Sequence, residues 1–219
     1  ERAWRIGREN SNPFTAKYNV APQQGNPSNY IPVVRQTEDG VYELLRMQWW
    51  LLPFWSKAPR IKYSTFNARV ETVATAASYR ESFRKRRCLI PAMGWYEWQE
   101  LPGGNLPWFL HRADEQILAL AGLWERWEGK DAYEGEIIES CSIVVGPANQ
   151  KFRPIHERMP FAPDSARAHR WLDPALTDTD SVLKLLEPNP DESIAFHRVS
   201  IRVSNARNQG ADLIDAVES

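Results

Sequence analysis

The sequence predicts an α+β protein built mainly of antiparallel strands. Segments rich in β-branched and aromatic residues follow one another along most of the chain, whereas the helical segments are few and do not alternate with strands in a βαβ rhythm. The chain also lacks a G-x-G-x-x-G motif and a Walker A loop, which disfavours a doubly wound nucleotide-binding fold. No repeat and no glycine- and serine-rich linker divides the chain, so we expect one domain over residues 1–219.

An irregular arm, a hairpin and a meander are expected in chain order. Residues 1–30 are rich in Asn, Pro and Gln, which predicts the arm. The extended residues 31–34 and 41–52 flank a turn at Glu38–Asp39–Gly40, which predicts the hairpin. Further strand-like segments predict a meander of antiparallel strands. They cover residues 88–91, 95–100, 108–112, 117–124 and 137–145.

Three helices are expected beside the strands. They cover residues 72–86, 164–172 and 180–186. In the first helix, Ser78 and Glu81 have the S-x-x-E spacing of a capping box, which satisfies backbone N–H groups at a helix start. Asp164 follows a proline and is expected to cap the second helix, and prolines end the third.

The composition excludes several classes of protein. With 42% hydrophobic and 25% charged residues and no apolar run long enough to span a bilayer, the chain is expected to be globular, neither disordered nor membrane-spanning. Two cysteines, Cys88 and Cys141, exclude a disulfide scaffold, and with only four histidines we expect no metal site. No secretory leader is visible, so we expect a cytoplasmic protein.

Tryptophan and positive charge are unusually concentrated. The chain has ten tryptophans, most of them in clusters. Between Lys57 and Arg87 it carries nine lysine or arginine residues against two acidic ones, Glu71 and Glu81, although the net charge of the whole chain is −1. A basic surface beside aromatic rings can form a groove for a polyanion. The alternative is a solvated helix face that carries Arg84–Arg87.

The segment Gly94–Trp98 places a carboxylate among aromatic residues on an expected strand. Because side chains alternate along a strand, Trp95 and Glu97 share one face, and Tyr96 shares the other with Trp98. A carboxyl group desolvated by aromatic rings has a raised pKa, which suits general acid/base catalysis near neutral pH. The alternative is a surface glutamate paired with an arginine.

The segment Pro154–Pro160 carries His156 and Arg158 in a loop that proline stiffens at both ends. Histidine exchanges protons readily near neutral pH, which makes His156 a candidate acid or base. The alternative is a loop histidine that is only hydrogen-bonded. The other three histidines lie in expected strands or on a helix: His111, His169 and His197.

Asn67 and Arg69 alternate onto one side of a further extended segment. An amide can orient a ligand and a guanidinium group can bind a phosphate through two hydrogen bonds, so the pair is a candidate ligand site. The alternative is a turn asparagine beside a surface arginine.

Eight segments in register resemble the SOS-response-associated peptidase (SRAP) family, which includes abasic-site-shielding proteins. They run from about residue 18 to the end of the chain: Tyr18–Pro22, Trp49–Trp55, Asn67–Glu71, Arg87–Ala92, Gly94–Trp98, Ala121–Trp124, Pro154–Pro160 and His197–Ser200. The resemblance implies a barrel-like core of mostly antiparallel strands with a few peripheral helices. It also implies a positively charged groove for single-stranded DNA that contains abasic sites, a monomeric and nucleoid-associated protein, and no cofactor.

Members of the family attach themselves covalently to the abasic site. The resemblance implies that the α-amine of an N-terminal cysteine condenses with the sugar aldehyde and that its thiol then closes a thiazolidine ring, a reaction consistent with the ordinary pKa values of both groups. It implies acid/base catalysis by Glu97 and His156, and positioning of the terminus and the sugar by Asn67.

The resemblance also assigns residues to DNA binding. Arg69 and Arg158 match guanidinium groups that contact phosphates beside the lesion, and Pro22 and Trp50 lie near positions that form a wedge against an adjoining duplex. At Trp50 the family commonly has glycine, so this residue could narrow the groove.

The expected nucleophile is not among the 219 residues, because neither Cys88 nor Cys141 has a free α-amine. The chain starts at Glu1 and the family usually has more residues before the Tyr18 motif, so we expect a leader before Glu1. The alternatives are a cysteine-type peptidase that removes its own leader, a non-catalytic single-strand-binding module and, as a different class, a carbohydrate-binding protein or glycosidase.

Overall fold

The hairpin expected in the first half of the chain begins a closed barrel. The computed structural model describes residues 6–9 and 17–217. β2 (Tyr30–Gln36) and β3 (Tyr42–Trp49) pair antiparallel. Gly40 lies in the turn between them with a φ of 81°, a left-handed conformation that glycine adopts without strain.

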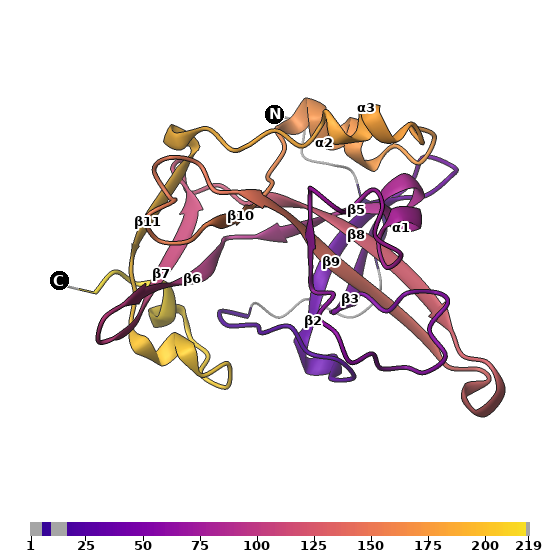
Figure 1. Cartoon of the computed structure of the whole chain (residues 1–219), viewed down its shortest axis with the longest axis horizontal. Helices are drawn as coiled ribbons and strands as arrows, with labels where there is room; N and C mark the ends of the chain where they lie inside the picture. Colours follow the sequence, from indigo (N-terminus) through magenta and orange to yellow (C-terminus); the bar gives the residue numbers. More distant parts are fainter. Residues whose placement is uncertain (1–5, 10–16, 218–219) are drawn as a thin grey trace.

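Three long strands of the expected meander complete the barrel. They are β5 (Arg87–Ala92), β8 (Leu118–Glu128) and β9 (Ile137–Pro147). The strand order is β3-β2-β5-β8-β9, and the end of β3 pairs in parallel with β9 at Gln48–Ser140 and Trp49–Cys141, which closes the ring (Figure 1). The predicted α+β fold with a barrel-like core is therefore confirmed.

Two short strands flank the last residues of β9. β4 (Asn67–Arg69) pairs with β9 in parallel and β10 (Arg158–Pro160) pairs with it antiparallel. β4 and β10 both pair with Val145 of β9. Because a strand can pair with one neighbour along each of its two edges, β4 and β10 lie on opposite sides of β9. This arrangement places the expected Asn67 and Arg158 segments beside the same stretch of strand.

The chain leaves the barrel after β5, begins a second sheet, and returns to the barrel at β8. β6 (Gly94–Leu101), β7 (Gly104–Arg112) and β11 (Ile194–Arg198) form the second sheet in the order β11-β7-β6. A Cβ atom on Gly94 would lie 2.2 Å from the carbonyl oxygen of Leu110, so only glycine permits this close start of β6. In Figure 1 this sheet lies to one side of the barrel.

The arm was expected to be irregular, and this prediction was wrong for one segment. β1 (Ile6–Glu9) pairs in parallel with β3, opposite Tyr42–Leu44. A short parallel pairing of this kind depends on the position of a distant strand and leaves no local signal.

The first expected helix is shorter than predicted. α1 spans Arg80–Lys85, and its N-cap residue, Tyr79, makes no side-chain capping bond, so the Ser78–Glu81 capping box does not form. Residues 70–79 form turns instead. Val73 and Tyr79 are buried, and the Tyr79 hydroxyl donates a hydrogen bond to the Asn67 carbonyl at 3.1 Å, so tertiary contacts override the local helix signal.

The other two helices follow the prediction more closely. α2 (Ser165–Leu172) starts after Asp164, whose carboxylate accepts a hydrogen bond from the Arg167 backbone N–H at 2.9 Å, which confirms the expected cap. α3 (Thr179–Leu183) begins one residue early and ends before 186. No helix in the described part of the chain is long and apolar enough to cross a membrane.

Arg87 at the start of β5 joins the helices to the barrel. This residue is buried, and its guanidinium group donates hydrogen bonds to five backbone carbonyls near the ends of α1 and α2. The acceptors are Phe83, Arg84, Trp171, Asp173 and Leu176. Carbonyl groups that a helix end leaves without partners are thereby satisfied.

Candidate functional site

Glu97 lies in the middle of β6, on the same face as Trp95. The alternation expected from the sequence is confirmed, since Tyr96 contacts Trp98 on the opposite face. The side chain of Glu97 is 22% exposed. Burial raises its pKa to about 7, and the nearby His156 and Trp95 lower it by less. A carboxyl group with this pKa can both donate and accept a proton near neutral pH.

His156 reaches the same place from the loop before β10. Its Nδ1 atom lies 3.8 Å from Oε2 of Glu97, and its side chain is 41% exposed. The same Nδ1 lies 2.9 Å from the Arg158 carbonyl oxygen and 3.1 Å from the Arg158 backbone nitrogen. Nδ1 can therefore donate to the carbonyl when protonated and accept from the N–H when not, so both protonation states have a partner.

The face of β6 that carries Glu97 also holds the His156 loop in place. Gln99 donates a hydrogen bond to the Pro154 carbonyl at 3.1 Å and accepts one from the Trp108 indole N–H at 3.2 Å. Trp95 packs edge to face on Phe152, with ring centroids 6.2 Å apart. These contacts fix the loop against the strand on both sides of Glu97.

β4 and β10 carry further polar residues of the candidate site, and both strands pair with β9. Asn67 and Arg69 are exposed while Ala68 between them is buried, so the predicted shared side is confirmed. Arg158 forms an ion pair with Glu71 at 2.6 Å. Burial alone would raise the pKa of Glu71, but backbone hydrogen bonding and the guanidinium groups of Arg158 and Arg69 lower it. The guanidinium group of Arg158 is thus already paired with a carboxylate of the protein.

No hydrogen bond joins Asn67 to Glu97 or His156 among the described residues. Its backbone carbonyl is bound by Tyr79, and its side chain makes no hydrogen bond with any of the described residues. The amide is therefore available to a ligand, and the pairing of β4 with β9 fixes its position.

Pro22 and Trp50 lie in neighbouring segments. Gln48 accepts a hydrogen bond from the Gly25 backbone N–H at 2.6 Å and donates one to the Trp50 carbonyl at 2.9 Å, which ties the Pro22 segment to the end of β3. The indole N–H of Trp50 donates to the Tyr63 carbonyl at 3.2 Å.

Residues at the end of the arm were not predicted as site residues, yet several contacts hold them. The Tyr96 hydroxyl donates to the Tyr18 carbonyl at 2.7 Å, and the buried Asn19 amide donates to the carbonyls of Val203 and Asn205. Gln209 accepts from the Tyr18 N–H at 3.1 Å and donates to the Asn19 carbonyl at 2.6 Å. The only signal in the sequence was that the Tyr18 motif and the closing motif both belong to the resemblance.

The two cysteines are not available for reaction. Cys88 and Cys141 are free and fully buried, and burial raises the pKa of both thiols well above its ordinary value. Neither can therefore act as an exposed thiolate.

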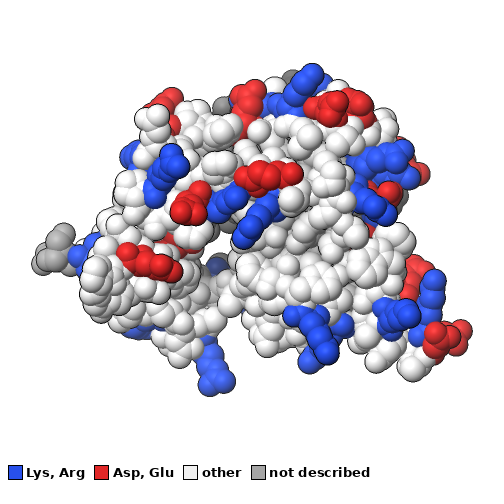
Figure 2. All heavy atoms as spheres, viewed as in Figure 1, with Lys and Arg blue, Asp and Glu red and all other residues white. Residues whose placement is uncertain are grey.

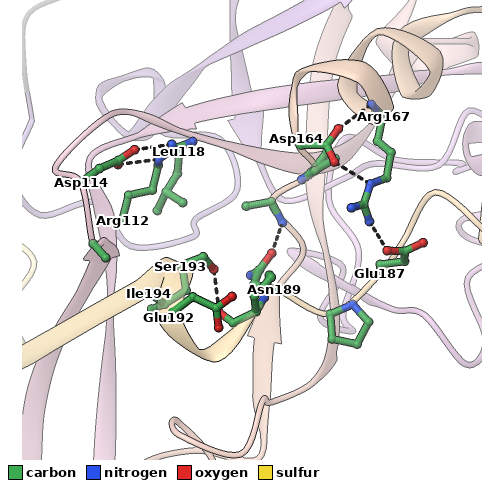
Figure 3. A pocket seen from close by; sticks show the side chains of 15 residues that line it. Arg112, Asp114, Leu118, Asp164, Arg167, Glu187, Asn189, Glu192, Ser193 and Ile194 are labelled. Carbon is green, nitrogen blue, oxygen red and sulfur yellow. Dashed lines mark hydrogen bonds and ion pairs between the residues drawn. The ribbon is translucent and has the colours of Figure 1, made fainter.

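The surface is hollowed beside β6. Figure 2 shows a recess between the part of the molecule built on β6 and β7 and the part built on β2 and β3, with acidic and basic side chains together along its upper edge. A different cavity of about 420 Å³ is lined by none of the candidate site residues (Figure 3). Its arginines are already paired, Arg112 with Asp114 and Arg167 with Asp164 and Glu187.

The structure joins a closed barrel to a smaller sheet whose strand β6 brings a carboxyl group of raised pKa close to an imidazole, an arrangement typical of proteins that transfer protons near neutral pH. The family model described as SOS response associated peptidase (SRAP) matches residues 1–206, and the chain belongs to this family. The resemblance inferred from the sequence is thereby confirmed.

Relatives and solved structures match over most of the chain. The abasic site processing protein YoqW of Bacillus subtilis is 32% identical over 204 residues, which cover 93% of this chain and 87% of YoqW. The abasic site processing protein HMCES of Gallus gallus is 30% identical over 94% of this chain and 67% of its own length. A crystal structure of a protein from Bacteroides thetaiotaomicron has a TM-score of 0.75 at 25% identity, covering 86% of this chain and 82% of that one.

Proposed function

We propose that this protein binds single-stranded DNA at abasic sites and forms a covalent cross-link with the open sugar. The observation that carries the proposal is the approach of His156 to within 3.8 Å of a glutamate whose pKa is about 7, with both side chains partly exposed. The names of YoqW and HMCES, both abasic site processing proteins, support the choice of substrate. The groove is expected to bind the strand through phosphates and bases.

The proposed reaction uses an N-terminal cysteine that lies outside the 219 residues. Glu97 donates a proton to the ring oxygen of the closed sugar, which opens to its aldehyde as the C1′ hydroxyl loses its proton. The α-amine of the cysteine adds to the aldehyde carbon, and His156 protonates the hydroxyl that leaves as water. The thiol then adds across the resulting C=N bond, with sulfur bonding to carbon and the thiol proton passing to nitrogen, which closes a thiazolidine ring.

The remaining site residues bind and orient the substrate. Asn67 offers an unoccupied amide to the sugar or to the reacting terminus. Arg69 and Arg158 bind the phosphates beside the lesion, and Arg158 exchanges Glu71 for a phosphate as the strand enters. Pro22 and Trp50 separate the bases of an adjoining duplex from the bound strand.

A denaturing gel tests this proposal. Protein with its natural N-terminus is incubated with a single-stranded oligonucleotide that contains one abasic site, and a shifted band that survives heating without borohydride is expected. Glu97→Gln should slow its appearance at least tenfold, whereas Glu100→Gln, an exposed glutamate on the opposite face of β6, should not. Peptide cleavage without a shifted band would support the peptidase alternative instead.

A further inference from the structure

The indole N–H of Trp95 is a buried donor without an acceptor of normal geometry. Its Nε1 atom is closed off from solvent and forms no regular hydrogen bond with any described residue. Two other side chains in the described part of the chain contain a buried polar atom of this kind, Arg86 and Ser142. A buried N–H group that lacks an acceptor destabilises the folded protein, so its presence beside a candidate catalytic group requires a physical explanation.

Neighbouring tryptophans of the same sheet do bind an acceptor through their indole N–H groups. Trp98, on the opposite face of β6, donates to the Ser204 hydroxyl at 3.0 Å. Trp108, which pairs with Glu97 across β6 and β7, donates to the Gln99 side chain at 3.2 Å. The missing acceptor at Trp95 is therefore not a general feature of the tryptophans in this sheet.

The carboxyl group of Glu97 is the acceptor that lies within the influence of this N–H. Trp95 and Glu97 are two residues apart in β6, so their side chains share one face of the strand. The Trp95 side chain lowers the pKa of Glu97, as an N–H dipole does when it faces the carboxylate. Among the described residues, the other group that lowers this pKa is His156, which reaches Glu97 from the loop before β10.

Packing holds the Trp95 ring in one orientation. The ring meets Phe152 edge to face, with centroids 6.2 Å apart, and packs against a buried apolar cluster that includes Leu110 and Ile155. Phe152 and Ile155 belong to the segment that leads to His156, so Trp95 lies between the strand that carries Glu97 and that segment. A donor fixed in this way needs no reorganisation when negative charge develops in front of it.

The proposed reaction produces such a charge. Glu97 becomes a carboxylate when its proton passes to the ring oxygen of the sugar. His156 then gives its proton to the hydroxyl that leaves as water, and the imidazole becomes neutral. From that step until Glu97 is protonated again, the carboxylate has no positively charged partner within the pair, and a fixed neutral donor is needed to stabilise it.

We propose that Trp95 is a positioning residue whose indole N–H donates a hydrogen bond to the Glu97 carboxylate and stabilises it between the two proton transfers. The place of this bond in the reaction rests on the proposed function, whereas the bond itself is a property of the protein without DNA. The bond should shorten as Glu97 loses its proton, because an ionised acceptor binds a donor more strongly than a neutral one does.

The indole N–H signals of ¹⁵N-labelled protein test the hydrogen bond directly by nuclear magnetic resonance. The Trp95 signal, assigned by its loss in Trp95→Phe, should move downfield as the pH rises through about 7 and Glu97 loses its proton. This movement should be absent from Glu97→Gln. The Trp98 signal is the internal control, since its N–H is already bound to Ser204. A Trp95 signal that stays in place, or that moves equally in Glu97→Gln, would overturn the inference.

The pH profile of cross-linking tests the role of the bond in the reaction. Trp95→Phe keeps an aromatic ring against Phe152 but removes the N–H. The pH above which the single-turnover rate falls should rise by about one pH unit, because a hydrogen bond to a charged group changes an ionisation equilibrium about tenfold. Affinity for DNA should not change. Trp98→Phe, on the opposite face of the same strand, is the matched control and should keep the wild-type profile.

Failure of this inference can be distinguished from failure of the proposed function, because the indole signal is measured without DNA. A Trp95 signal that follows Glu97 in a protein that forms no cross-link would support the hydrogen bond and contradict the reaction. An unchanged pH profile in Trp95→Phe, with the fold checked by circular dichroism, would overturn the role of Trp95 and leave the proposed function standing. Adding Trp95→Phe to Glu97→Gln should not slow the reaction further, and an equal additional loss would show that Trp95 acts only through packing.

Discussion

Gln99 donates a hydrogen bond to the Pro154 carbonyl at 3.1 Å, two residues before His156 and two residues after Glu97 in β6. The two members of the candidate pair are therefore held together by a side chain that belongs to neither. Trp108 orients that side chain through its indole N–H. This bridge and the packing of Trp95 on Phe152 hold the loop against the strand face that carries Glu97, whose carboxylate lies 3.8 Å from His156.

Replacing Gln99 with leucine should loosen the His156 loop while keeping the packing of the strand. We expect the single-turnover rate of cross-linking to fall about tenfold at neutral pH, since a positioning residue acts through the geometry of the reacting groups. The pH profile of the rate should also change as the coupling of Glu97 to His156 weakens. Trp108→Phe should change both in the same direction by less. A lower rate with an unchanged pH profile would indicate a purely structural role for Gln99.

The titration of Glu97 should appear in the stability of the protein. Burial raises its pKa from 4.5 to about 7, so the folded state retains a proton that the unfolded state releases between these values. The destabilising effect of the carboxylate is absent below pH 4.5, grows between pH 4.5 and 7, and is complete above that range.

We therefore expect the difference in free energy of unfolding between Glu97→Gln and the wild type to change with pH. At pH 8 this difference should favour the variant by about 1–3 kcal/mol more than it does at pH 4.5. Urea unfolding at both pH values measures the difference. Glu100→Gln, at an exposed position of the same strand, should follow the wild type. A difference that does not vary with pH would show that the Glu97 carboxyl titrates normally.

Glu71 should compete with DNA for Arg158. Both side chains are partly exposed, and such a pair contributes little to stability, so Glu71→Gln should leave the melting temperature nearly unchanged. Removing the carboxylate frees Arg158 and lessens the negative charge near Arg69. We expect two- to fivefold tighter binding of single-stranded DNA at low salt, with a smaller gain at high salt, when anisotropy titrations are compared. Weaker binding would mean that Glu71 orients Arg158 rather than competing for it.

Arg87 should be a strong determinant of stability. Arg87→Met removes hydrogen bonds to five buried or partly buried carbonyls, and we expect a loss of about 3–5 kcal/mol in the free energy of unfolding. For a chain of 219 residues this corresponds to a melting temperature lower by roughly 10 °C. Arg84→Met, at an exposed position of α1, is the matched control and should shift it little. Similar melting temperatures for both variants would contradict the role assigned to Arg87.

The local sequence pattern predicted many strands of the barrel and the individual candidate site residues, but not the distances between those residues. Alternation correctly placed Trp95 with Glu97, and Asn67 with Arg69. The closure of the barrel rests on two residue pairs between β3 and β9, and the bridge from Gln99 to Pro154 joins distant segments. Such contacts depend on register across the whole fold, so no spacing in the sequence reveals them.

The contacts that hold Tyr18 and Asn19 should position the arm for the reaction. Both Asn19 amide hydrogens are donated to the segment at Val203–Asn205, and Gln209 binds the backbone of Tyr18 and Asn19 from the same side. Gln209→Leu should free the backbone of the arm without exposing a core residue. We expect the cross-linking rate at saturating DNA to fall about tenfold while the affinity for undamaged DNA changes less than twofold, because in the proposed reaction the arm delivers the reacting terminus and the groove binds the strand.

The matched control for Gln209→Leu is Asn208→Leu, whose side chain binds the Arg202 carbonyl and not the arm. This variant should keep the wild-type rate and affinity. Single-turnover gels and anisotropy on the same preparations separate the two quantities. Equal losses of rate and affinity in Gln209→Leu would mean that the C-terminal segment supports the groove as a whole, whereas a loss of rate alone identifies it as the clamp that sets where the arm begins.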